Sequence, residues 1–185
     1  MIDDGAKRSF EEQGYVVARG LFDAEETAFL RDHFTRLREA GAYPGDVVGV
    51  EPHSDDPLRK YPRMIHMHRW DAVALDWLLE PRLARSLAGL LGGMEPFAVQ
   101  TMLYFKPPGA RGQAVHQDQY YLRAEPGTCI AAWMALDPCD EENGCLEVLR
   151  GSHEWPVLCT IAADTTRSFT DITVPLSDDV SSSPS

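Results

Sequence analysis

Two residues near the middle of the chain have types and a spacing that suit a metal ion. His116 and Asp118 lie in the stretch KPPGARGQAVHQDQYYL, two positions apart on a run that we expect to form a β-strand. Residues i and i+2 of a strand project from the same face, so both side chains can reach one ion. A neutral imidazole and one carboxylate, joined by a second histidine, form the facial triad of non-haem iron(II) oxygenases. Zinc accepts the same ligands, but the open face of such a triad favours iron.

The H-x-D pattern is short, and a surface ion pair is its ordinary alternative. His66 and His68 alternate in the same way, but no carboxylate pattern lies beside them, which favours packing or a substrate loop. Three side chains that follow the H-x-D pattern are expected to face the substrate: Gln119, Tyr120 and Tyr121. Two cations could meet an anionic substrate or only solvent: Lys60 and Arg63.

The segment before these residues, 1–93, is predicted to be mostly helical after a short strand at 15–17. Asp23 followed by Glu26 forms a capping-box pattern ahead of a helix whose apolar residues repeat at helical spacing, namely Leu30, Phe34 and Leu37. Residues 71–91 predict two helices that meet near Pro81, because proline suits a helix start and not its interior. Residues 43–63 are rich in Pro, Gly and Asp and predict a long functional loop.

Residues 94–176 change character and predict β-structure. The runs PFAVQTMLYF, AVHQDQYYL, GTCIAAWMAL and GCLEVLRGS are short and apolar, and turns rich in Pro, Gly and Asn separate them. Helices followed by regularly spaced strands favour a mainly β fold with flanking N-terminal helices, a sandwich or jelly roll, in a single domain over 1–185. The tail at 177–185 has the composition of a disordered segment.

Composition excludes several classes of function. The net charge of -12 argues against a protein that follows nucleic-acid phosphates, which needs clustered Lys and Arg. The four cysteines form no CxxC pair of the kind that binds zinc or does redox chemistry. No signal peptide or apolar run long enough to span a membrane is recognisable, so we expect a cytoplasmic protein, in an oligomeric state that the sequence does not specify.

Several ordered blocks give the chain a wider resemblance. FEEQGYVVARGLF with its following helix, TMLYFKPPG, VHQDQYYL, AAWMAL and NGCLEVLRGSH stand in the order found in the phytanoyl-CoA dioxygenase (PhyH-like) family, which the chain resembles. The resemblance implies a double-stranded β-helix of the cupin type and dependence on Fe(II), 2-oxoglutarate and O2. It also implies hydroxylation of a small molecule, for instance one of secondary metabolism, and not halogenation, because Asp118 retains the carboxylate ligand.

The resemblance assigns roles to five residues. His116 and Asp118 match two iron ligands, while Met102, Lys106 and Trp133 match positions around the 2-oxoglutarate pocket. A methionine and a tryptophan within strands are, on the other hand, often simply part of a core.

One ligand and one cosubstrate residue have no match. The family's second ligand histidine lies well beyond the Gly-Ser-His motif, so His153 is the weaker candidate for this role, and no histidine follows it. The downstream arginine for the cosubstrate carboxylate is also missing, because Arg167 comes too early. We therefore expect a chain whose β-helix is incomplete at the C-terminus, through truncation or degeneration. Two alternatives stay open: an inactive or truncated β-sandwich binding protein, and a cupin-like metal enzyme that does not use 2-oxoglutarate.

Overall fold

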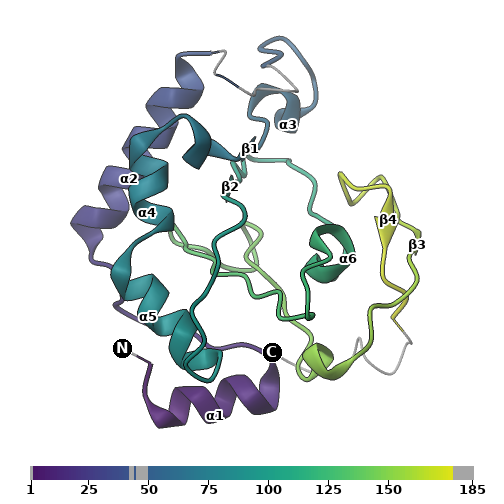
Figure 1. Ribbon diagram of the computed structural model, residues 1–185. Coiled ribbons are helices and arrows are strands. Elements are labelled where there is room, and N and C mark those ends of the chain that lie inside the picture. Colours follow the sequence, from purple (N-terminus) through teal and green to yellow (C-terminus); the bar gives the residue numbers. More distant parts are fainter. Residues whose placement is uncertain (1, 42–43, 45–49, 177–185) are drawn as a thin grey trace. The chain divides into compact units, whose positions relative to one another are not determined.

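The computed structural model describes residues 2–41, 44 and 50–176 (Figure 1). These residues divide into two compact units. The N-terminal unit comprises Met1–Ala110 and Leu136–Pro138, and the C-terminal unit comprises Arg111–Ala135 and Cys139–Ser185. The single domain expected over 1–185 stays a prediction. The tail at 177–185 lies outside the described residues, as does most of the segment 42–49 within the expected loop.

The N-terminal unit is largely helical, as the sequence predicts. Its helices are α1 (Asp4–Gln13), α2 (Ala24–Glu39), α3 (Pro57–Lys60), α4 (Ala72–Leu78) and α5 (Pro81–Leu90), with a 3-10 turn η1 (Met67–Arg69). Residues 15–17, expected to form a strand, are instead part of the connection between α1 and α2. Within the described part of the chain, no helix is long and apolar enough to cross a membrane.

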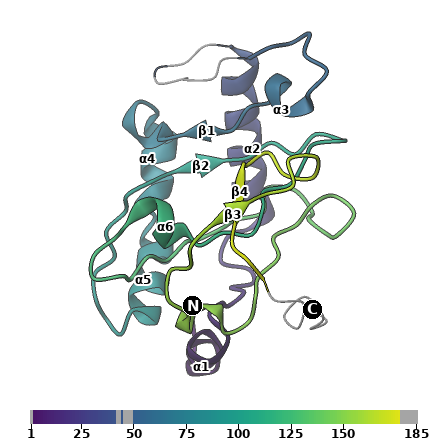
Figure 2. The same cartoon turned by 90° about the vertical axis from the view of Figure 1, so that its right-hand side faces the viewer.

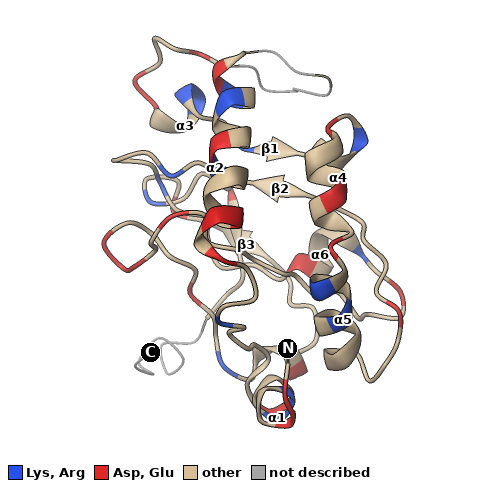
Figure 3. Ribbon diagram, turned by 90° about the vertical axis from the view of Figure 1, so that its left-hand side faces the viewer, with Lys and Arg blue, Asp and Glu red and all other residues tan. Residues whose placement is uncertain are grey.

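Helix α2 begins as its sequence predicts. The Asp23 carboxylate accepts from the Glu26 amide at 2.9 Å, and the Glu26 carboxylate accepts from the Asp23 amide at 2.9 Å, which completes a capping box. Leu30 and Phe34 are buried at 2% and 6% exposure, so this helix contributes to the core as expected. Glu25 and Glu26 lie in its first turn and Arg36 and Arg38 in its last (Figure 3), positions at which the helix dipole favours these charges.

Helices α4 and α5 meet where the sequence places their boundary. Asp71 caps α4 by accepting from the Ala74 amide at 2.8 Å, and Pro81 occupies the first turn of α5. Arg82 of α5 pairs with Glu26 of α2 and with Glu80, and its guanidinium lies 4.7 Å from the centre of the Phe22 ring. These contacts join the start of α2 to α5.

The described residues form four strands, each of two residues, in two antiparallel pairs. In the N-terminal unit, β1 (Met64–Ile65) pairs with β2 (Met102–Leu103), and the two lie side by side in Figure 2. In the C-terminal unit, β3 (Ile161–Ala162) pairs with β4 (Ile172–Thr173). Small sheets with helices therefore replace the regular series of strands expected over 94–176, because extended runs become strands only where a neighbouring segment completes a ladder of hydrogen bonds.

The strand expected to carry both candidate metal ligands is also shorter than predicted. The extended backbone ends at Gln117, and Asp118 opens the short helix α6 (Asp118–Leu122). A 3-10 turn, η2 (Ser152–Glu154), replaces the end of the strand expected in GCLEVLRGS. The prediction that His116 and Asp118 share one strand is therefore wrong, although an i, i+2 pair can still converge at a strand end.

Candidate metal centre

The His116 and Asp118 side chains converge in the C-terminal unit. Nε2 of His116 lies 3.4 Å from Oδ1 of Asp118, and the two side chains are 29% and 48% exposed. His116 comes from the end of an extended segment, whereas Asp118 comes from the first turn of α6. The pair is thus partly open to solvent, and a ligand could reach it.

The imidazole of His116 is held in one orientation. Its Nδ1 lies 2.9 Å from the carbonyl oxygen of Ala114. A carbonyl can only accept, so Nδ1 carries the hydrogen, and in the neutral ring Nε2 then carries a lone pair. The Gln113 side-chain amide lies 3.3 Å from Nε2 and can donate to it. In protein metal sites, a ligating histidine usually donates the N–H of its other ring nitrogen to a carbonyl, a carboxylate or a water. The bond from Nδ1 of His116 to Ala114 has this form.

The electrostatics of the pair are those of a hydrogen-bonded His–Asp ion pair. The Asp118 carboxylate, through its hydrogen bond and its charge, raises the pKa of His116 above 6.5 in spite of partial burial. The hydrogen bond from His116 likewise lowers the pKa of Asp118 below 3.8. Burial, with the charge of Asp118, raises the pKa of the nearby Cys129 thiol. Two acceptor atoms this close favour a positive species between them, which is either a proton or a metal ion.

The donor set fits two positions of an iron(II) site. Nitrogen and oxygen ligands bind such divalent ions at roughly 2.1 Å, so two ligands at adjacent corners of an octahedron are about 3 Å apart. The observed 3.4 Å between Nε2 and Oδ1 is close to this spacing. The described residues contain no group of three or more His, Cys, Asp or Glu side chains able to hold a metal, so they supply the pair without a third such ligand.

Backbone and side-chain hydrogen bonds fix the peptide that carries the pair. The carbonyl of Val115 accepts from the Val174 amide at 2.9 Å and from the Thr173 hydroxyl at 3.0 Å. The Gln117 side chain, between the two candidate ligands, donates to the Pro156 carbonyl at 3.1 Å and accepts from the Leu158 amide at 2.9 Å. The sequence interpretation missed Gln117, since only the H-x-D spacing around it carried a signal.

The aromatic residues after the pair lie close to it. The rings of His116 and Tyr121 are 6.0 Å apart, and those of Tyr120 and Tyr121 are 5.2 Å apart, both in edge-to-face geometry. Tyr121 is 47% exposed, whereas Gln119 points its amide at the Ala124 carbonyl, 2.8 Å away. The position of Tyr121 is compatible with its expected substrate-facing role, while Gln119 serves local structure.

The residues expected around the 2-oxoglutarate pocket fall into both units. Trp133, in the C-terminal unit, is 51% exposed, so it is not a core residue. Met102 lies in β2 opposite Ile65, and Lys106 follows this strand in the N-terminal unit. Their roles in cosubstrate binding stay predictions.

The other histidine candidates do not complete a triad. His153 is exposed in η2 and joins no described group of three metal-binding side chains with His116 and Asp118. His66 and His68 belong to the N-terminal unit, where their rings are 5.8 Å apart. His68 bonds to the Thr101 hydroxyl at 2.9 Å, which supports the packing interpretation.

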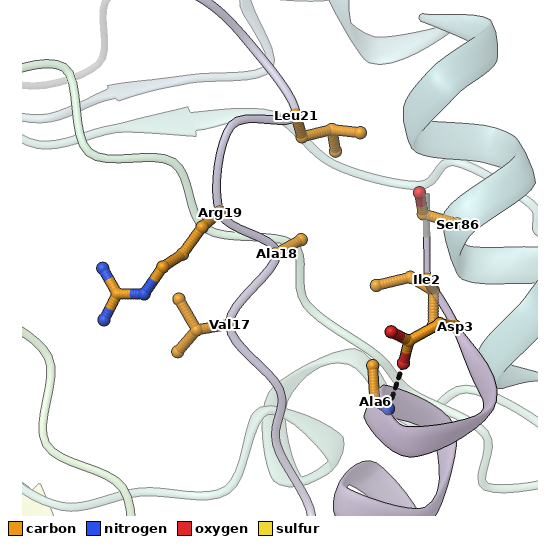
Figure 4. Close-up of a pocket in the computed structure, with 8 residues that line it drawn as sticks. All are labelled: Ile2, Asp3, Ala6, Val17, Ala18, Arg19, Leu21 and Ser86. Carbon is orange, nitrogen blue, oxygen red and sulfur yellow. Dashed lines mark hydrogen bonds between the residues drawn. The ribbon is translucent and has the colours of Figure 1, made fainter.

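Two pockets of the described chain lie away from the His116–Asp118 pair. A pocket of about 150 Å³ beside α1 (Figure 4) is lined by Ile2, Asp3, Ala6, Val17, Ala18, Arg19, Leu21 and Ser86. A shallow groove at the start of α2 is lined by Asp23, Glu25, Glu26, Phe29 and Trp77. Both belong to the N-terminal unit, and neither includes a candidate site residue.

Comparison with known proteins shows which family the chain resembles. Phytanoyl-CoA dioxygenase 1 of Oryza sativa subsp. japonica is 27% identical over 83% of the chain and 66% of its own length. A phytanoyl-CoA dioxygenase domain-containing protein 1 of Danio rerio is 40% identical, also over 83% of the chain and 66% of its own length. The peroxisomal phytanoyl-CoA dioxygenase of Bos taurus is 26% identical over 82% of the chain and 48% of its own length.

The chain thus spans about half to two thirds of the length of these curated relatives. No solved structure matches it significantly. The sequence profile described as Phytanoyl-CoA dioxygenase (PhyH) matches residues 10–175, which is most of the chain and includes both candidate ligands. The chain therefore belongs to the phytanoyl-CoA dioxygenase (PhyH) family.

Proposed function

We propose that this chain carries the His-Asp part of the metal site of an Fe(II)- and 2-oxoglutarate-dependent dioxygenase that hydroxylates a small molecule. The observation that carries the proposal is the 3.4 Å approach of His116 Nε2 and Asp118 Oδ1, with Nδ1 engaged by a backbone carbonyl. Family membership supports the same chemistry. When bound, the iron would supply the activation of O2 for hydroxylation, with 2-oxoglutarate converted to succinate and carbon dioxide.

The chain's own residues have separate tasks in this proposal. His116 presents a neutral nitrogen lone pair and Asp118 a negative oxygen, so the pair neutralises part of the metal charge and leaves the opposite face open. Tyr121, whose ring lies 6.0 Å from that of His116, is proposed to face the substrate. Met102, Lys106 and Trp133 are proposed to contact 2-oxoglutarate, with the Lys106 ammonium matched to a cosubstrate carboxylate.

The double-stranded β-helix is part of the same proposal. The extended runs at 128–135 and 145–150, which are not strands among the described residues, would add strands to that fold once paired. Several large apolar side chains of these runs are exposed, including Trp133, Leu146 and Val148. Exposed apolar residues at alternating positions are what an unpaired sandwich strand presents.

A second candidate function is a binding protein without turnover. It is favoured by one observation, that the described residues hold no third metal-binding side chain with His116 and Asp118. Such a protein would bind a metal or a ligand weakly and would form no product. The cupin-like alternative based on His66 and His68 has less support, because His68 is engaged by Thr101.

The experiment that separates these functions measures succinate. The purified chain is supplied with Fe(II), ascorbate, O2 and 2-oxoglutarate, with and without phytanoyl-CoA, the compound named in its relatives. The proposal expects succinate in the wild type, its loss in Asp118→Asn, and its retention in Asp171→Asn, a matched change at an exposed aspartate of the same unit. Equal succinate in wild type and Asp118→Asn, or none in a folded wild type, would reject turnover at this pair and favour the binding protein.

A further inference from the structure

We propose that Ser168 is a positioning residue for the metal site, acting through the backbone of Ala114 on the tautomer of His116. This inference rests on the proposed function, since it concerns the same histidine. Ser168 is far from the H-x-D pattern in sequence, yet it lies beside it in the C-terminal unit, where Gly112 and Ser168 form a parallel bridge.

The Ser168 hydroxyl is buried and fully engaged. The residue is 4% exposed, and its Oγ accepts from the Ala114 amide at 3.0 Å and from the Thr170 amide at 2.9 Å. Its own hydrogen then points to the Thr170 hydroxyl oxygen at 2.8 Å, and the Thr170 hydroxyl donates onward to the Ile172 carbonyl at 3.4 Å. Every donor in this chain of bonds has an acceptor, so the hydroxyl has one favoured orientation.

The same residue carries the contact to His116. Ala114 donates its amide hydrogen to Ser168 and accepts the Nδ1–H of His116 on its carbonyl oxygen at 2.9 Å. The amide of Ala114 lies in the planar 113–114 peptide unit and its carbonyl in the 114–115 unit, so the bond to Ser168 holds the first of the two planes between which Ala114 sets the aim of its carbonyl. Ser168 is thus linked to the imidazole through one residue.

The tautomer matters because the neutral ring has two competing partners. With hydrogen on Nδ1, the ring bonds to Ala114 and leaves the Nε2 lone pair for a metal ion. With hydrogen on Nε2, the ring would donate to Asp118, 3.4 Å away, and this would occupy both candidate ligands at once. A well-aimed Ala114 carbonyl therefore favours the metal-binding tautomer over the one that blocks the site.

Other contacts of this segment do not replace that of Ser168. The Gly112 amide and carbonyl bond to Arg167 and Phe169, and the Val115 carbonyl bonds to Val174, which hold the flanking residues. For the Ala114 amide, the second acceptor is the Thr170 hydroxyl at the longer distance of 3.4 Å. Loss of the Ser168 oxygen would therefore release the Ala114 amide, and with it the Thr170 amide, while the backbone bonds of Gly112 and Val115 remain.

The test reads the tautomer in the metal-free chain. Nitrogen-15 chemical shifts of the His116 ring, recorded at alkaline pH where the ring is neutral, distinguish hydrogen on Nδ1 from hydrogen on Nε2. We expect the wild type to show the Nδ1–H form, and Ser168→Ala and the nearly isosteric Ser168→Cys to shift toward Nε2–H. Ser168→Thr, which keeps the oxygen, should restore the wild-type shifts. Thr166→Ala removes a hydroxyl of the same loop that bonds only within its own turn, so it should change nothing at His116.

Metal affinity gives a second measurement. Fe(II) binding under anaerobic conditions should weaken in Ser168→Ala and Ser168→Cys, by up to the about tenfold to hundredfold loss that follows removal of a direct hydrogen-bond partner of a metal ligand. A wild-type ring with hydrogen on Nε2, or Ser168 variants that lose stability but keep the wild-type tautomer and affinity, would overturn the inference. Absence of metal binding in every variant would reject the proposed function, while the tautomer comparison would still decide the role of Ser168.

Discussion

Protons should compete with a metal for the His116–Asp118 pair. This competition should appear as a pH dependence of the metal affinity. A metal needs the Nε2 lone pair of His116, which the imidazolium lacks. Since Asp118 raises the pKa of His116 above 6.5, the protonated form persists closer to neutrality than in a free histidine. Lowering the pH through the raised pKa of His116 should therefore weaken metal binding.

The magnitude follows from the number of protons displaced. Below the raised pKa of His116, binding one metal releases one proton, so affinity should fall about tenfold per pH unit, or about 1.4 kcal/mol. The lowered pKa of Asp118, below 3.8, means that this carboxylate stays ionised over the range where His116 titrates. The slope should therefore be that of one proton and should steepen only when Asp118 also begins to protonate.

The metal-free chain should show the opposite trend across neutrality. The raised pKa of His116 contributes stability that is complete below pH 6.5 and is lost as the pH rises through the raised value. The lowered pKa of Asp118 contributes stability that is present above pH 3.8 and is lost as the pH falls through the lowered value. The pair thus stabilises the metal-free fold most between pH 3.8 and 6.5, whereas metal binding is strongest above that window.

Isothermal titration with Mn(II), an oxygen-stable substitute for Fe(II), measures the affinity at several pH values. Asp118→Asn removes the main cause of the raised His116 pKa, so its affinity should begin to fall at a lower pH, from a weaker starting value. Asp171→Asn serves as the matched control. A wild-type affinity that does not change through the pH range around and below neutrality would refute the reasoning, because the metal would then not be using Nε2 of His116.

Three further predictions concern the supports of the site and of the fold. Gln117→Ala should weaken Fe(II) binding about tenfold to a hundredfold by freeing the peptide between the ligands, and unchanged affinity in the titration would count against this support. Leu30 is 2% exposed, so Leu30→Ala should lower the free energy of unfolding, measured by urea denaturation, by about 2–5 kcal/mol. A smaller loss would mean that the surrounding side chains collapse into the cavity. Asp23→Ala should cost about 0.5–2 kcal/mol in the same assay by removing the cap of α2, and an unchanged midpoint would show that the cap is redundant.

The helical half of the chain was readable from sequence because its signals are local. The capping box of Asp23 and Glu26 and the position of Pro81 at the start of α5 depend on neighbours within a few residues, and both predictions are confirmed. The strand expected at 15–17 failed because a short apolar run forms a strand only with a partner, which sequence periodicity does not supply.

The site was readable only in part for the same reason. The spacing of His116 and Asp118 is a local signal, and these side chains do converge. The hydrogen bonds that hold the segment around these ligands are not local. Gln117 bonds to a residue 41 positions away and Ser168 to one 54 positions away. Glutamine and serine occur in many settings, so their roles appear only when the backbone brings those segments together.

Anaerobic titration of the folded chain with Fe(II) in the presence of 2-oxoglutarate tests the central claim most directly. Chelation of the metal by 2-oxoglutarate produces a weak visible charge-transfer band. The account predicts this band in the wild type and in His153→Ala, a matched change at an exposed histidine, and its loss in His116→Ala. A band that survives in His116→Ala, or that is absent from the folded wild type, would contradict the claim that His116 and Asp118 hold the iron.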